Sequence, residues 1–90
     1  MSVFDYFLQT TTSRILSLSE IQAREPVDPD RLKRALEKMV LAKLGILPRR
    51  LPMRVVRDSS GKYRVIDGNT TYHALIALGE KTGVVELQEF

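Results

Sequence analysis

The chain has 90 residues, a formal net charge of +3 and no cysteine. This length predicts one domain with a small core, and the lack of cysteine excludes a disulfide framework and a thiolate metal site. No apolar run approaches the roughly 20 residues of a membrane-spanning helix, and the first residues do not resemble a signal peptide. We therefore expect a soluble, cytoplasmic protein with no membrane partner.

The charge is unevenly distributed along the chain. Residues 24–64 contain twelve of the fourteen Lys and Arg residues but only five of the eleven acids, so the two ends together are acidic. This polarity suits a partner that carries phosphate, such as a nucleotide or a nucleic acid. A basic face that only contacts solvent accounts for the charge equally well.

The first residues predict a short helix. Ser2 and Asp5 have the spacing of a capping box, and the apolar residues around them allow one or two turns up to Leu8. A helix this short is not stable alone in water, so we expect it to pack on the domain or on another copy of the chain. The polar run at residues 10–13 ends it. We divide the chain into an N-terminal helical segment, residues 1–13, and a main domain, residues 14–90.

The first half of the main domain predicts a strand and a long helix. The strand covers residues 14–18 and is followed by a turn and a loop that ends at residue 27. Asp28 and Pro29 supply an N-cap and a first helical residue, and Gly45 is the expected end of the helix. The expected buried stripe of this helix comprises Leu32, Ala35, Leu36, Met39, Val40 and Leu44.

The second half predicts a hairpin, a helix and a last strand. Strands at residues 53–57 and 62–66 flank a turn at residues 58–61, and a helix over residues 69–78 ends at Gly79. Alternating apolar and polar residues after position 82 indicate the last strand. This order predicts an α+β fold, in which helices pack on a small mixed sheet.

The passage from strand to helix at residues 67–71 is the best candidate for a functional site. A strand that leads through Gly68 into a helix leaves the first N–H groups of the helix without intrahelical partners, all directed at one spot. Such a spot attracts anions, and Asn69, Thr70 and Thr71 add side-chain donors to it. The simpler interpretation is an N-cap followed by two first-turn hydroxyls.

Carboxylates near this turn are candidates for catalysis or metal binding. Asp67 suits Mg²⁺ beside a nucleotide, although an acid before glycine more often caps a turn. Glu25 and Asp28 precede the long helix and are candidates for a general base, but an N-cap role accounts better for Asp28. His73 has no partner at a metal-ligand spacing, and Tyr72 is predicted to pack in the core.

Several motifs follow one another in a fixed order. They are Leu18-Ser-Glu-Ile21, the acidic-proline helix start, Gly45-Ile-Leu, Pro52-Met-Arg-Val-Val56 and Tyr63-Arg-Val-Ile-Asp-Gly-Asn69. Over residues 14–88 this order resembles the ParB/sulfiredoxin superfamily, and specifically its ParB-like nuclease domains. The resemblance implies a small mixed sheet with packed helices, and ATP or CTP with Mg²⁺ as ligand.

The chain departs from that family at the glycine turn. Family members often have His-Arg or Arg-Arg there to hold nucleotide phosphate, and Thr70 and Thr71 occupy the matching positions. Asn69 stands where sulfiredoxins have a reactive cysteine, which excludes sulfiredoxin activity. The resemblance implies that Arg31 faces phosphate, because sulfiredoxins have a lysine at this helix position. The other arginines expected to contact phosphate or nucleic acid are Arg24, Arg49, Arg50 and Arg54.

Three functions are compatible with these features. We favour a small ParB-like DNA-binding or nucleotide-binding domain, of a kind suited to plasmids or phages, that holds phosphate at residues 68–71. The second function is a weak metal-dependent nuclease or nucleotide hydrolase that uses Asp67 and Glu25. The third is an interaction or inhibitory protein that retained the fold and lost the ligand, with the N-terminal helix as its docking or dimerisation element.

Overall fold

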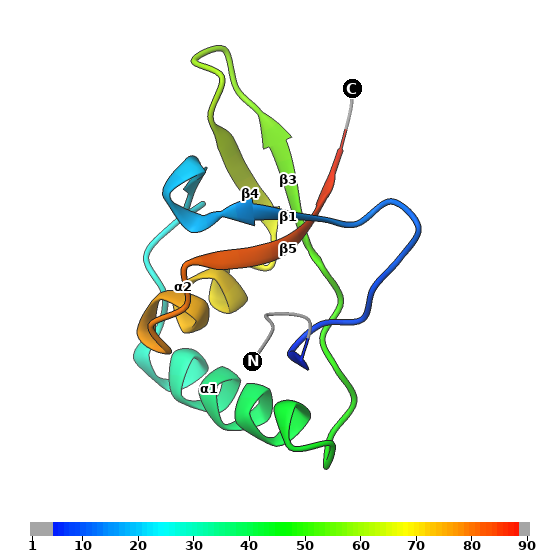
Figure 1. Ribbon diagram of the computed structural model, residues 1–90. Coiled ribbons are helices and arrows are strands. Elements are labelled where there is room, and N and C mark those ends of the chain that lie inside the picture. Colours follow the sequence, from blue (N-terminus) through cyan, green and yellow to red (C-terminus); the bar gives the residue numbers. More distant parts are fainter. Residues whose placement is uncertain (1–4, 89–90) are drawn as a thin grey trace.

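The computed structural model describes residues 5–88 (Figure 1). It contains two α-helices, a short 3₁₀ helix and a five-stranded sheet, which confirms the predicted α+β class. The elements in chain order are β1 (Arg14–Ser17), η2 (Leu18–Glu20), β2 (Ile21–Gln22), α1 (Pro29–Lys43), β3 (Met53–Arg57), β4 (Tyr63–Asp67), α2 (Asn69–Ala77) and β5 (Thr82–Leu87). Neither described helix is long and apolar enough to cross a membrane.

The sheet is mixed, with the strand order β1-β5-β3-β4-β2. The β1/β5 and β3/β4 pairs are antiparallel, whereas the β5/β3 and β4/β2 pairs are parallel. Strand β2 was predicted as loop, since two residues are too few to show alternation and its pairing with β4 is not local in sequence. The β3/β4 hairpin closes at Asp58, whose carboxylate accepts hydrogen bonds from the backbone N–H groups of Ser60 and Lys62.

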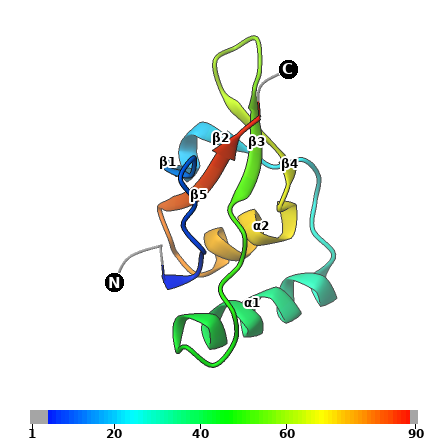
Figure 2. The ribbon, with the colours of Figure 1, turned by 90° about the vertical axis from the view of Figure 1, so that its right-hand side faces the viewer.

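Both helices lie on one side of the sheet. Two views at right angles place α2 against the strands and α1 beyond it (Figures 1 and 2). The core between these layers includes the fully buried side chains of Met39, Met53, Val65, Leu75 and Val84. This arrangement fixes the start of α2 between the sheet and α1.

The helix ends follow the predicted local rules. The Asp28 carboxylate accepts a hydrogen bond from the Asp30 N–H at 3.2 Å and caps α1, with Pro29 as the first helical residue. Gly45 and Gly79 have φ values of +80° and +77°, directly after the C-caps of α1 and α2. The ends of both helices were therefore predictable from short motifs.

The buried stripe of α1 differs from the prediction in its last turn. Ala35 and Met39 are buried as expected, but Ala42 is also buried, while Val40 and Leu44 are 43% and 66% exposed. The Lys43 ammonium lies over the Tyr6 ring, 5.1 Å from its centroid, so the N-terminal segment covers this side of the last turn. A helical pattern alone does not show which neighbour covers each turn.

Phe7 and Leu8 run beside the connector between α1 and β3, directly after a turn at Asp5 and Tyr6. Phe7 forms a parallel bridge with Arg50, in which the Leu8 N–H donates to the Arg50 carbonyl and the Arg50 N–H donates to the Tyr6 carbonyl, each at 2.8 Å. The helix expected from residue 2 to residue 8 therefore does not include residues 7 and 8, while Asp5 is in a 3₁₀ conformation, Tyr6 is in a turn, and residues 2–4 lie outside the described residues. The pairing with the connector satisfies the backbone while Tyr6 and Phe7 reach the core.

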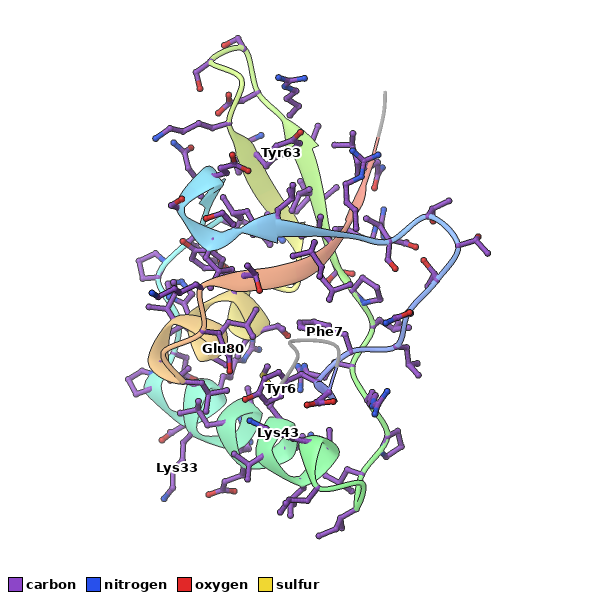
Figure 3. All side chains as sticks on the ribbon, viewed as in Figure 1. Tyr6, Phe7, Lys33, Lys43, Tyr63 and Glu80 are labelled. Carbon is purple, nitrogen blue, oxygen red and sulfur yellow. The ribbon has the colours of Figure 1, made fainter. Side chains whose placement is uncertain are left out.

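Tyr6 connects the N-terminal segment to the end of α1 and to the residues that follow α2. Its hydroxyl donates to the Glu80 carboxylate at 3.2 Å and accepts a hydrogen bond from the Lys43 ammonium at 3.2 Å (Figure 3). Tyr6 and Phe7 are thus part of the core of this chain, which leaves them unavailable to a docking partner.

Candidate functional site

Helix α2 begins without a side-chain cap. Its N-cap is Gly68, at φ 99° and ψ 24°, and no side chain bonds to the first N–H groups. The first intrahelical bond joins the Tyr72 N–H to the Gly68 carbonyl at 2.9 Å, so the N–H groups of residues 69–71 have no acceptor within the helix. The alternative interpretation, in which Asn69 is the N-cap, is wrong.

Only glycine fits at position 68. Its φ lies in the left-handed region, and a Cβ atom there would lie 3.2 Å from the Met53 Cα atom and 3.0 Å from the Met53 Cγ atom. Met53 is the first residue of β3, beside the end of β4. The glycine therefore allows β4 to turn into α2 while the turn stays packed against the sheet.

A cleft of about 620 Å³ opens at this helix start. One wall is the loop of residues 24–28, and the other is the end of β4 with the first turn of α2, residues 66–71. Arg31 and Arg50 complete the lining. The cleft thus brings together most of the predicted site residues: Arg24, Glu25, Arg31, Arg50, Asp67, Gly68, Asn69, Thr70 and Thr71.

Arg50 is the most firmly positioned cation of the cleft. Its Nε–H donates to the Thr71 hydroxyl at 2.9 Å, and its backbone is fixed by the bridge to Phe7. Half-burial of the guanidinium lowers the pKa of Arg50 through desolvation, although arginine stays protonated at neutral pH. Thr71 is only 4% exposed, so it acts on the cleft chiefly by orienting Arg50.

The cleft holds carboxylates as well as cations. Glu25 and Asp67 are both exposed, one on each wall, while the Asp28 carboxylate is engaged as the α1 cap. Within residues 5–88 no three acidic or histidine side chains are grouped closely enough to hold a metal ion. The residues present fit an Mg²⁺ ion shared with a bound phosphate chain, which needs only one or two carboxylates.

A basic groove continues from the cleft between α1 and the start of α2. This groove, about 270 Å³ in volume, is lined by Arg31, Arg34, Ala35, Lys38, Arg50 and Thr70. It contains four cations and no acid among its lining residues. Arg34 and Lys38 were not predicted as site residues, although their spacing from Arg31, three and seven residues, places all three on one helix face.

Two predicted phosphate contacts lie elsewhere. Arg49 is exposed on the connector and lines neither the cleft nor the basic groove. Arg54 is exposed on β3, where its guanidinium donates to the Gln88 side chain. Arg24 is at the cleft, and its guanidinium donates to the Ile66 carbonyl at 3.4 Å.

The side chain of Asn69 is engaged with the loop opposite. The Asn69 amide forms hydrogen bonds with the backbone of Arg24 and Glu25, and the His73 ring forms one with the Glu25 carbonyl. Tyr72 packs against the core and donates its hydroxyl hydrogen to the Ile21 carbonyl at 3.1 Å, as the packing interpretation predicted. Asn69 therefore offers the cleft its backbone N–H, while its amide holds the loop.

No protein-family model and no curated protein matches the sequence. Solved structures do match. C-terminally truncated SbnI from Staphylococcus aureus is similar with a TM-score of 0.71 and 27% identity over 87% of this chain and 31% of that one. A free serine kinase in complex with AMP has a TM-score of 0.71 and 19% identity over 94% of this chain and 34% of that one. The chain thus spans about a third of the length of either structure.

Two further similar structures are a ParB protein and a sulfiredoxin, the proteins after which the fold is named. C-terminally truncated ParB from Caulobacter crescentus, complexed with CTP-gamma-S, has a TM-score of 0.66 and 18% identity over 87% of this chain and 44% of that one. Sulfiredoxin from Arabidopsis thaliana has a TM-score of 0.63 and 20% identity over 87% of this chain and 85% of that one. The chain therefore has the ParB/sulfiredoxin-like fold that the sequence motifs predicted.

Proposed function

We propose that this domain binds a nucleotide in the cleft and holds its phosphate at the start of α2. The observation that carries the proposal is the uncapped first turn of α2 beside the half-buried Arg50 guanidinium, which Thr71 fixes at 2.9 Å. Backbone N–H groups, the positive end of a helix dipole and a guanidinium together form a strong site for phosphate. A bound phosphate would also offset the desolvation of Arg50.

The nucleoside is expected to lie along the loop wall. Pro26, Val27 and Ile66 give this part of the cleft its apolar surface, and the volume of about 620 Å³ lies in the range of small-molecule sites. The similar structures support a nucleotide as ligand, because one is a serine kinase in complex with AMP and another is a ParB protein complexed with CTP-gamma-S. We place further phosphates of a di- or triphosphate in the basic groove.

Titration of the ¹⁵N-labelled protein tests the proposal. ATP, CTP and AMP, each with and without Mg²⁺, are added at low salt, and a short single-stranded DNA is the comparison ligand. We expect saturable shifts of the amide signals of residues 68–71 with the nucleotides. Shifts with DNA alone would make a nucleic-acid backbone the ligand, and no shift at residues 68–71 with any of them would refute the proposal.

The basic groove predicts a preference for longer phosphate chains. The double substitution Arg34→Ala and Lys38→Ala is expected to weaken ATP binding by about five- to thirtyfold, because two exposed contacts of roughly 0.5–1 kcal/mol each are lost. AMP binding is expected to change less than twofold. Isothermal titration calorimetry with both nucleotides measures the difference.

A control with the same change in net charge is available. Lys33 and Lys62 are exposed, and neither lines the cleft or the basic groove (Figure 3 shows Lys33 on the outer side of α1). Lys33→Ala with Lys62→Ala should leave both affinities nearly unchanged. Equal losses in the two double variants would mean that general charge, rather than the groove, attracts the ligand.

A second candidate function is hydrolysis of the bound nucleotide, favoured by the presence of Glu25 and Asp67 in the same cleft. Asp67 would hold Mg²⁺ jointly with phosphate, and the ion would neutralise charge on the phosphates. Glu25 would accept a proton from the attacking water. We expect Asp67→Asn and Glu25→Gln to abolish any Mg²⁺-dependent phosphate release but to retain nucleotide binding, with Asp58→Asn at the hairpin as control. A wild-type protein that binds nucleotide and releases no phosphate would be a binding module.

A further inference from the structure

The loop wall of the cleft is fastened to α2 by two side chains one helical turn apart. The Asn69 Oδ1 atom accepts hydrogen bonds from the N–H groups of Arg24 at 2.9 Å and Glu25 at 3.2 Å, and its Nδ2 donates to the Glu25 carbonyl at 3.0 Å. The His73 Nε2 atom lies 2.8 Å from the same carbonyl. Because a carbonyl only accepts hydrogen bonds, this ring nitrogen carries the hydrogen.

These contacts are the main hold on the loop. Within the part of the chain that the structure describes, the backbone of residues 24–27 is hydrogen-bonded to the rest of the protein only through Asn69 and His73. Three residues of this segment, Glu25, Pro26 and Val27, line the cleft. The position of that wall therefore depends on an interaction between segments more than forty residues apart in sequence.

The phosphate end of the cleft is built differently. Arg50 is held by Thr71 and by the bridge to Phe7, and the N–H groups belong to α2 itself. Loss of the loop contacts would leave those groups in place. A substitution can therefore disturb the loop wall of the cleft without disturbing the start of α2.

We propose that Asn69 and His73 form a clamp that positions the loop wall and so determines how tightly the cleft holds the nucleoside part of its ligand, with little effect on the phosphate. This inference rests on the proposed nucleotide binding. Asn69 and His73 are positioning residues in this scheme, because their side chains contact the loop and act on the ligand through it. Asn69 thereby has a different role from the side-chain phosphate donor predicted from the sequence.

The test compares a nucleotide with a ligand that lacks a nucleoside. Dissociation constants for ATP, CTP and inorganic tripolyphosphate are measured by calorimetry for the wild type, Asn69→Ala and Asn69→Leu. We expect both variants to bind whichever nucleotide the wild type prefers about tenfold more weakly, because all three hydrogen bonds of the Asn69 amide are lost. Tripolyphosphate binding is expected to stay within twofold, since both replacements are uncharged and retain the backbone N–H.

His73 supplies a rescue experiment. His73→Ala is expected to weaken nucleotide binding by a smaller factor than Asn69→Ala, and His73→Gln should restore part of it, because a glutamine amide also donates to a carbonyl. Amide hydrogen exchange at Arg24 and Glu25 should accelerate in Asn69→Ala while exchange in the core strands stays unchanged. Arg50→Met, in contrast, should weaken nucleotide and tripolyphosphate alike.

The failures of the two proposals are distinguishable. Equal loss of nucleotide and tripolyphosphate binding in Asn69→Ala would make Asn69 a phosphate ligand and overturn the clamp. If Asn69→Ala left both nucleotide binding and the amide hydrogen exchange of residues 24 and 25 unchanged, the clamp would also be overturned. A wild type that binds neither ligand would refute nucleotide binding, and accelerated exchange in Asn69→Ala would then still support the clamp as the device that holds the loop.

Discussion

Replacement of Arg50 by alanine is expected to weaken nucleotide binding by about 30- to 100-fold, or roughly 2–3 kcal/mol. The guanidinium is half-buried and oriented by Thr71, so it meets a phosphate in a geometry already formed before binding. Its planar fork also suits two parallel hydrogen bonds to phosphate oxygens. Calorimetry with ATP or CTP measures the loss of affinity. The ionic strength is kept the same for all variants, because salt screens exposed charges more strongly than the half-buried Arg50 guanidinium.

The neighbouring arginine is a matched control for this prediction. Arg49→Ala removes the same charge one residue away, from a side chain outside the cleft and the basic groove. The affinity of Arg49→Ala for ATP or CTP should stay within about twofold of the wild-type affinity. Arg50→Lys is expected to be intermediate, because an ammonium retains the charge and loses the fork. If Arg49→Ala and Arg50→Ala weaken binding equally, the phosphate does not lie at the start of α2.

Signals confined to a few neighbouring residues were predictable from the sequence. Asp28 with Pro29 fixed the start of α1, and Gly45 and Gly79 marked the helix ends, because caps and left-handed glycines act over one turn. The turn that we propose to bind phosphate was predicted in the same way, since it consists of Gly68 and the three residues after it. The family resemblance added Arg31 to the same site.

Features that depend on distant pairing were not predictable. Strand β2 and the bridge at Phe7 exist because β4 and the connector lie beside them, and no local pattern reports this. The same reason explains why the sequence could not separate Arg50 from Arg49. In an extended chain neighbouring side chains point to opposite sides, and the bridge to Phe7 decides which one faces the cleft. The contact between Asn69 and the loop at residues 24 and 25 is equally remote.

Phe7 should prove essential for folding, because it is completely buried although it lies in the segment that was expected to dock on a partner. Phe7→Ala removes a large core side chain and is expected to cost about 3–5 kcal/mol. A 90-residue domain has a total free energy of unfolding of roughly 5–13 kcal/mol. The variant should therefore lose a large fraction of its stability, which urea denaturation followed by circular dichroism measures as a lower midpoint.

Leu8 distinguishes a core role from a docking role for this segment. Leu8 is 46% exposed, so Leu8→Ala should change the free energy of unfolding by less than about 1 kcal/mol. A docking segment would behave differently: Phe7→Ala would keep the wild-type urea midpoint and instead reduce self-association in analytical ultracentrifugation. That outcome would contradict the buried position of Phe7. Because the bridge between Phe7 and Arg50 also fixes the connector, the core packing of the N-terminal segment supports the arginine on which the proposed phosphate binding depends.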